Sequence, residues 1–153
     1  MLKKLKETTS LQIHSLNAFS LVTPDGDTPV SVIAYQTLNL KFSAYMRLEQ
    51  LKKLLKQKEN IRLEFKESGH SLPSNLFESI CSMLNREGGD ILLGVDDNGQ
   101  PLGVGSDYAN ELISQIVNQS NNQQKLDPPF ILFPRVFDID GKKIIHIQIP
   151  VSS

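Results

Sequence analysis

The chain has 153 residues and one cysteine, and 16 Lys and Arg residues stand against 17 Asp and Glu residues, a formal net charge of -1. This length suits a single domain, the lone cysteine excludes an internal disulfide, and the charge total argues against a uniformly basic nucleic-acid binder. No apolar run approaches the ~20 residues of a membrane-spanning helix, and no apolar stretch follows the basic start as in a signal peptide. We therefore expect a cytoplasmic protein that does not enter membranes.

Residues 1–42 are expected to form an N-terminal hairpin extension, and residues 43–153 are expected to form the main domain. Apolar residues flank the turn-forming run Pro24-Asp25-Gly26-Asp27, which predicts two strands within residues 10–41. Residues 10–19 are also compatible with a helix.

Residues 43–58 are predicted to form the first helix of the domain. Apolar residues recur at three- and four-residue spacing, which is typical of the buried stripe of a helix; they are Tyr45, Leu48, Leu51 (or Lys52 in its place) and Leu55. Ser43 precedes this stripe, and its hydroxyl can cap the helix start. Four lysines lie in the last turns, where the helix dipole favours cations; they are Lys52, Lys53, Lys56 and Lys58.

The segment 61–67 alternates apolar and charged residues, which predicts a half-buried strand. Its inner face would carry Ile61, Leu63 and Phe65. Its outer face would be charged and would carry Arg62, Glu64 and Lys66.

A second helix is predicted over residues 74–87, with Asn75 and Glu78 at capping-box spacing near its start. Cys81 lies on its apolar side, which favours a core cysteine over a reactive one. The helix is expected to end at Gly88-Gly89, because glycine readily adopts the left-handed conformation of a helix end.

A buried strand over residues 90–95 should follow, and the turn at Asp97-Asn98-Gly99 should lead into a short returning strand over residues 101–104. A third helix is predicted over residues 107–119, with Asp107 as its cap.

Two final strands are predicted over residues 130–138 and 143–151, joined at Asp140-Gly141, a strong hairpin signal. Ile145, Ile147, Ile149 and Val151 would face inward, and His146 and Gln148 outward. This order of elements predicts an α+β fold, in which a small mixed β-sheet packs with about three helices.

The charge total hides two blocks of opposite sign. Residues 41–66 hold eight basic residues against three acidic ones, whereas residues 67–140 hold three against eleven. The basic block could track a phosphate backbone with little readout of sequence, or it could simply be the solvated face of a helix. With 7% aromatic residues and no Trp, base stacking is a weaker expectation. The candidate phosphate contacts are Lys52, Lys53, Lys56, Lys58, Arg62, Lys66 and Arg86.

Three carboxylates, Glu59, Glu64 and Asp96, lie at or near predicted strand ends. Such carboxylates can converge on one Mg²⁺ or Mn²⁺ ion, which could activate water for phosphodiester cleavage. Spacing alone favours the alternative, in which Glu64 and Lys66 form an exposed pair and Asp96 opens a turn. Without a P-loop or zinc-ligand spacing, no other cofactor is expected in this domain.

The order of several short motifs resembles the Schlafen AlbA-like domain over about residues 45–153. The motifs are Leu63-Glu64-Phe65-Lys66, then Asn85-Arg86-Glu87-Gly88-Gly89, then Gly94-Val95-Asp96-Asp97-Asn98-Gly99, and then Gly103-Val104. Tight backbone geometry is predicted at four glycines: Gly88, Gly89, Gly94 and Gly99.

This resemblance implies a DNA-binding role. In bacteria, such domains commonly begin larger proteins that are described as transcriptional regulators or RecG-related ATP-dependent DNA helicases. It also implies that the chain is the N-terminal fragment of a longer protein, with any ATPase part lying outside it. Some eukaryotic members cleave RNA with a Glu, a second Glu five residues later and a later Asp, and Glu59, Glu64 and Asp96 match that spacing.

Three hypotheses follow. The favoured one is a non-enzymatic module that binds DNA or RNA. The second is a metal-dependent nuclease that uses Glu59, Glu64 and Asp96 on Mg²⁺ or Mn²⁺. The third is a protein-interaction domain, and because Alba-like folds often pair, a homodimer is an expectation.

Overall fold

The computed structural model describes residues 32–127 and 129–151. The chain divides into two compact units, Met1–Arg47 and Leu48–Ser153. The helices and strands are α2 (Val32–Leu55), β1 (Leu63–Lys66), α3 (Leu76–Leu84), β2 (Gly89–Leu93), α4 (Ala109–Ser120), β3 (Arg135–Ile139) and β4 (Lys142–Ile149). Among the described residues, no helix is both long enough and apolar enough to span a membrane.

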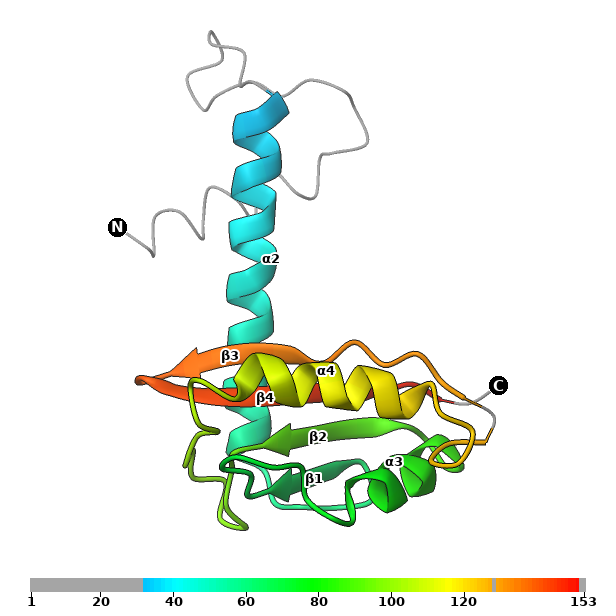
Figure 1. Cartoon of the computed structure of the whole chain (residues 1–153). Coiled ribbons are helices and arrows are strands. Elements are labelled where there is room, and N and C mark those ends of the chain that lie inside the picture. Colours follow the sequence, from blue (N-terminus) through cyan, green and yellow to red (C-terminus); the bar gives the residue numbers. More distant parts are fainter. Residues whose placement is uncertain (1–31, 128, 152–153) are drawn as a thin grey trace, which may run out of the picture. The chain divides into compact units, whose positions relative to one another are not determined.

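The four strands form one mixed sheet in the order β1-β2-β4-β3 (Figure 1). β1 and β2 run parallel and are connected through α3, whereas β4 is antiparallel to both β2 and β3. Parallel neighbours need such a crossover, while β3 and β4 need only the tight turn at Asp140-Gly141. The predicted α+β fold with a small mixed sheet is therefore confirmed.

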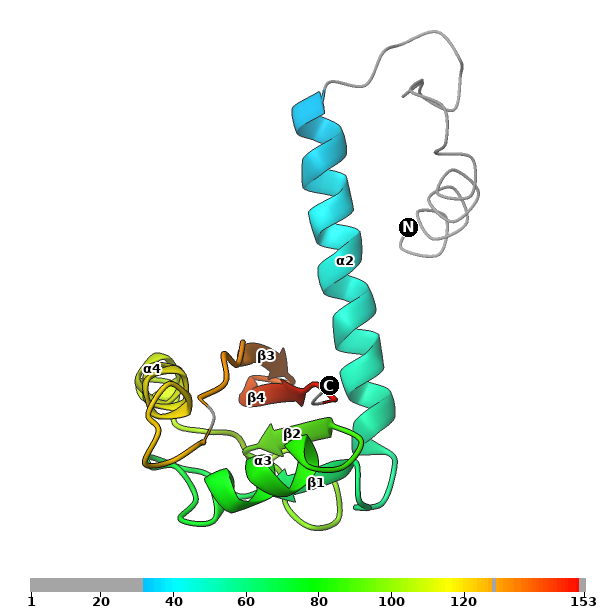
Figure 2. The same ribbon diagram turned by 90° about the vertical axis from the view of Figure 1, so that its right-hand side faces the viewer.

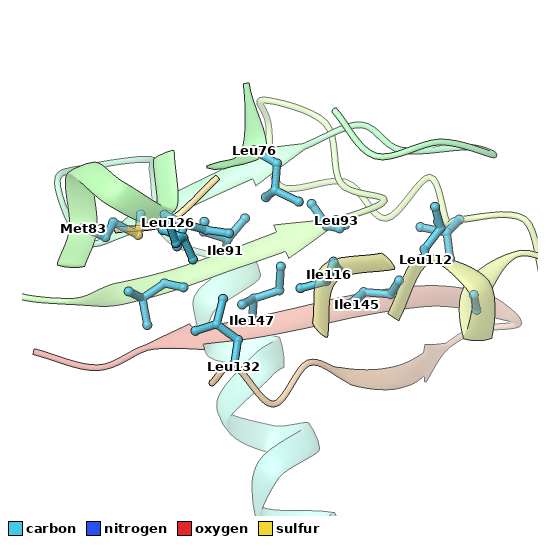
Figure 3. Close-up of a cluster of buried hydrophobic side chains, with 14 residues drawn as sticks. Leu76, Met83, Ile91, Leu93, Leu112, Ile116, Leu126, Leu132, Ile145 and Ile147 are labelled. Atoms are coloured by element: carbon cyan, nitrogen blue, oxygen red, sulfur yellow. The ribbon is translucent and has the colours of Figure 1, made fainter. Parts of the chain in front are cut away.

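Helices α3 and α4 pack against one face of the sheet through an aliphatic core (Figure 3). Successive residues of a strand point to opposite faces, so Ile91 and Leu93 enter this core while Leu92 points away from it. The other buried members include Leu76, Met83, Leu112, Ile116, Leu126, Leu132, Ile145 and Ile147. These residues confirm the inward face predicted for the last strand.

Residues 48–55 of α2 pack on the opposite face of the sheet (Figure 2). Leu51 is 1% exposed and lies at the centre of this second core. Its buried partners on the sheet side are Leu63, Phe65, Leu92, Val95, Ile139 and Ile144. Because both faces are covered, β2 is apolar at every position from residue 91 to 93.

The prediction of a strand within residues 32–41 is wrong, because α2 runs through this segment. Ala34 and Leu38 favour a helix, and a helix that has already nucleated extends residue by residue without a further nucleation cost. Ser43 therefore lies inside the helix rather than at its start. The rest of the predicted hairpin, residues 10–31, lies outside the described residues.

The predicted helix ends are also corrected. α2 ends at Leu55 rather than at residue 58. α3 is shorter than the predicted 74–87, and the Asn75 side chain makes no capping bond. Tyr108, not Asp107, occupies the cap position of α4. Helix ends are set by the surrounding contacts as much as by the local sequence.

The strand predicted over residues 130–138 begins only at Arg135. Pro129 and Pro134 carry no N–H group, so the segment between them cannot form a continuous ladder. Val151, predicted to face inward, lies beyond β4 and is exposed.

Two further strand predictions are only partly confirmed. Residues 101–104 form no strand and instead make two isolated bridges, Val95 with Pro101 and Val104 with Lys143. Ile61, predicted to face inward, lies before β1 and is exposed.

The four motif glycines, Gly88, Gly89, Gly94 and Gly99, all have positive φ angles. At Gly99 φ is 78°, and an added Cβ would lie 2.3 Å from the carbonyl oxygen of Leu55. At Gly88 an added Cβ would lie 2.4 Å from the carbonyl oxygen of Ile149. Both positions thus require glycine. At Gly99, the missing side chain lets the turn after β2 approach the end of α2.

Candidate nucleic-acid interface

The outer face predicted for β1 is partly covered by the start of α3, although Arg62 remains exposed. The Lys66 side chain is 7% exposed, and its Nζ forms an ion pair with Glu64. The same Nζ donates a hydrogen bond to Asn75 Oδ1 at 3.0 Å, and Ser79 Oγ donates to Glu64 Oε1 at 2.8 Å. This four-residue network satisfies a buried cation, so Lys66 is not placed to contact a phosphate backbone.

Glu59 protects the outer edge of the sheet. Its Oε1 accepts a hydrogen bond from the Phe65 N–H at 2.7 Å, and Asn60 exchanges two backbone hydrogen bonds with Leu63. β1 is an edge strand, and such strands expose unpaired backbone groups unless something covers them. The segment that contains Glu59 therefore runs beside β1 and completes its hydrogen bonds.

Asp96 stabilises the turn after β2. Its Oδ1 accepts hydrogen bonds from the N–H groups of Asn98 and Gln100, at 2.9 and 2.8 Å. This geometry confirms the alternative in which Asp96 opens a turn.

Each of the three predicted carboxylates thus has its own contacts within the fold. No group of three or more His, Cys, Asp or Glu side chains within residues 32–127 and 129–151 is arranged to hold a metal ion. The predicted convergence of Glu59, Glu64 and Asp96 on one cation is therefore not found in this structure.

The other six candidate phosphate contacts are exposed: Lys52, Lys53, Lys56, Lys58, Arg62 and Arg86. Lys52 pairs with Glu49 at 3.5 Å, and Arg62 pairs with Glu87, both on the surface. In the part of the chain that the structure describes, the remaining four make no ion pair. Surface pairs contribute about 0–1 kcal/mol, so Lys52 and Arg62 remain available to a phosphate.

These six cations follow the β1 side of the sheet, and we call them the basic row. Lys52 and Lys53 lie in the last turn of α2. Lys56 and Lys58 lie in the segment that leads back along β1, and Arg62 lies immediately before this strand. Arg86 lies between α3 and β2. The start of β2 is next to Arg62, because the carbonyl of Arg62 accepts a hydrogen bond from the Asp90 N–H at 2.8 Å. The row therefore comprises the last turn of α2 and the segments that lead into β1 and β2.

Several contacts were not anticipated from the sequence. His146 Nε2 lies 2.7 Å from Asp90 Oδ1, and the two side chains are 18% and 27% exposed. The sequence also did not predict that Asn75 and Ser79 would form hydrogen bonds with the Lys66–Glu64 pair. The only signal in the sequence was the outward position of His146 within its strand, since the register of β2 with β4 joins residues far apart in the chain.

Comparison with known proteins identifies a matching family and similar solved structures. Residues 59–153 match the family described as Schlafen, AlbA_2. The solution structure of the N-terminal domain of an ATP-dependent DNA helicase RecG-related protein from Nitrosomonas europaea is similar, with a TM-score of 0.55 and 21% identity. That match covers 69% of this chain and 72% of the other, and it confirms the fold.

A second similar structure is that of the DIP2311 protein from Corynebacterium diphtheriae, at 17% identity and a TM-score of 0.40. The match covers 69% of this chain and 26% of that protein. Among curated proteins, none matches this sequence. The motifs, the mixed sheet with its helices and the match over residues 59–153 agree, and the chain belongs to the Schlafen AlbA_2 family.

Proposed function

We propose that this domain binds nucleic acid, with DNA as the expected partner, through phosphate contacts made by the basic row. The observation that carries the proposal is the set of four exposed cations without an acidic partner, Lys53, Lys56, Lys58 and Arg86, in the described part of the chain. Exposed Lys and Arg side chains bind phosphates by charge and release counterions from the nucleic acid. The near-zero total charge does not oppose this, because salt screens charges that lie more than about 8–10 Å apart.

The wider setting is proposed from relatives. Members that resemble this chain, and the named neighbour from Nitrosomonas europaea, suggest the N-terminal domain of a bacterial, cytoplasmic transcriptional regulator or RecG-related helicase. Any ATP-dependent step of such a protein would belong to parts outside this chain. Within it, the domain would contribute affinity for the nucleic acid and little readout of sequence.

The contacts of the carboxylates support a non-enzymatic role over the metal-dependent nuclease. Glu59 completes the edge of β1, Glu64 balances the buried Lys66, and Asp96 holds a turn. Among the described residues, these three side chains do not form a group arranged to hold a metal ion. The nuclease hypothesis stays a prediction, and Mg²⁺ or Mn²⁺ would be its cofactor.

Fluorescence anisotropy with labelled duplex and single-stranded DNA, at about 50 mM salt and above, tests the proposal. A triple variant, Lys53→Ala with Lys56→Ala and Lys58→Ala, should weaken binding and lower the slope of log K against log salt by about 3. Lys125→Ala is the matched control, because Lys125 is exposed but lies between α4 and β3. Absence of binding at low salt, or equal effects of the triple variant and the control, would overturn the proposal.

A further inference from the structure

Large apolar side chains remain exposed on the segment that leads into β3. Phe133 is 74% exposed and Ile131 is 60% exposed, the former more than any other large hydrophobic residue among those described. Folded proteins seldom leave neighbouring large apolar groups in water without a use for them. The segment continues the line of β3 in Figure 1.

Alternation along this segment shows which side of the sheet the exposed groups occupy. Phe130, Leu132 and Val136 all pack with the core beneath α3 and α4. The residues between them, Ile131 and Phe133, and then Arg135, are exposed. Because alternate residues of an extended chain point in opposite directions, these three residues lie on the face of the sheet away from α3 and α4. We call them the Phe133 stripe.

Polar and aromatic groups surround the stripe on the same face. Arg135 is paired across the strands with His146, whose ring lies 6.2 Å from that of Phe137. His146 in turn contacts Asp90, so this acid already has a partner. Arg135 itself makes no hydrogen bond or ion pair with a side chain anywhere in the described residues, so its guanidinium is available to a ligand.

We propose that the Phe133 stripe is a stacking site for a single-stranded nucleic acid. An unstacked base would lie on the phenyl ring of Phe133, and Arg135 would contact the neighbouring phosphate or the base plane. Exposed aromatic rings beside cations are a general means by which proteins hold single strands. This inference rests on the proposed function and adds to it the form of nucleic acid that is preferred.

The position of the stripe suits a strand that also contacts the basic row. Arg62 precedes β1 at one edge of the sheet, and the Phe133 stripe lies at the other edge, next to β4. Arg62 precedes Leu63, which pairs with Asp90 at the start of β2. Arg135 is opposite His146, the partner of Leu92, and Phe133 lies two residues before Arg135, toward the end of the sheet where β2 begins. Three inter-strand spacings of about 4.8 Å separate the two edges, roughly 14 Å in all, which a few nucleotides can span.

A second copy of the chain is the less favoured occupant. Strand-to-strand pairing through β3 would need a regular edge, but Pro129 and Pro134 interrupt the backbone donors before it. β3 itself is five residues long and carries the charged residues Arg135 and Asp138, which are features that discourage edge pairing.

Substitutions at the stripe test the proposal directly. Phe133→Ala should weaken binding of a labelled thymidine oligomer of about 12 nucleotides by about 5- to 100-fold, while duplex binding changes little. Phe133→Tyr should retain the affinity and Phe133→Leu should not, since only the former keeps an aromatic face. Leu102→Ala is the matched control, because it removes an exposed apolar group without a ring that lies outside the stripe.

A tryptophan reporter gives a second measurement, because the chain has no Trp of its own. The tryptophan fluorescence of the Phe133→Trp variant should be quenched when the oligomer binds. The fluorescence of Leu102→Trp, at an exposed site beyond the other end of β2, should not change. An RNA oligomer of the same length shows whether the sugar matters.

The outcomes separate the two proposals. If the Lys53, Lys56 and Lys58 variant loses binding while Phe133→Ala binds the oligomer like wild type, the stacking site is refuted and the basic row stands. If no nucleic acid binds at all, the proposed function fails first. If Phe133→Ala leaves oligomer binding intact and instead changes the oligomeric state in light scattering, the stripe is a protein contact and the stacking proposal is overturned.

Discussion

Replacing Lys66 by methionine should lower the free energy of unfolding by about 2–4 kcal/mol. The lysine side chain is 7% exposed, and its ammonium group contacts Glu64 and Asn75. Methionine keeps most of the volume of the lysine stem, so the loss reports on the charge rather than on a cavity. Removal of one partner of a buried pair costs about 3–5 kcal/mol; we lower this range because Glu64 is 30% exposed.

A second substitution separates the unpaired charge from the lost contact. Glu64→Gln keeps an oxygen that accepts from Ser79 but removes the charge that Lys66→Met leaves unbalanced. The double variant should therefore be more stable than the sum of the two single losses predicts, with a coupling energy of about 1–3 kcal/mol.

Urea unfolding followed by circular dichroism measures these free energies, provided that the slope with urea stays constant among the variants. Affinity of the folded Lys66→Met variant for nucleic acid should equal that of wild type, since the ammonium group is buried. The reasoning is refuted if stability stays within about 0.5 kcal/mol of wild type while phosphate-dependent binding falls. Lys66 would then be a surface contact, as the sequence alone suggested.

Three further outcomes are expected. Gly99→Ala should lower the free energy of unfolding in urea by about 2 kcal/mol or more, and Gly141→Ala by about 1 kcal/mol. Both residues have a positive φ, but only a Cβ at residue 99 would contact backbone atoms. Equal losses would contradict this close contact. Addition of Mn²⁺ should give no cleavage of labelled tRNA or single-stranded DNA, and any turnover that wild type shows and Glu64→Ala lacks would revive the nuclease hypothesis. The Gly141 N–H and the Lys143 ammonium lower the pKa of Asp138 below its usual 3.8, so the stability it adds is present above that pH and is lost as the pH falls through the lowered pKa. Asp138→Asn should accordingly lower the thermal midpoint slightly at neutral pH, and the difference from wild type should vanish in acid.

Hydrophobic periodicity was sufficient to predict the elements whose burial follows a simple pattern. The apolar run of residues 91–93 predicted a buried strand, and alternation at Ile145 and Ile147 predicted the inward face of β4. The Asp140-Gly141 turn was also correct, and residue 140 has the positive φ that such a hairpin turn requires. These features depend on local sequence, which is why they could be predicted.

What failed depended on contacts between distant parts of the chain. The period-two pattern correctly put Glu64 and Lys66 on one face of β1, but it could not show that α3 would cover that face. Asn75 occupies the cap position of α3, but its side chain accepts a hydrogen bond from Lys66 instead of capping the helix. Similarly, composition alone could not show that Phe133 stays exposed.

The motif that identifies the family is largely explained by demands of the fold. Gly99 allows the end of α2 to pack closely against the turn, and Asp96 accepts the hydrogen bonds that close this turn. Lys66 and Glu64 connect β1 to the start of α3 through their hydrogen bonds with Asn75 and Ser79. A chain can therefore keep this motif in order to fold, whatever its domain binds. Differences in function among such domains should accordingly be carried by exposed residues outside the motif, and in this chain the proposed ones are Phe133 and the four lysines of the basic row.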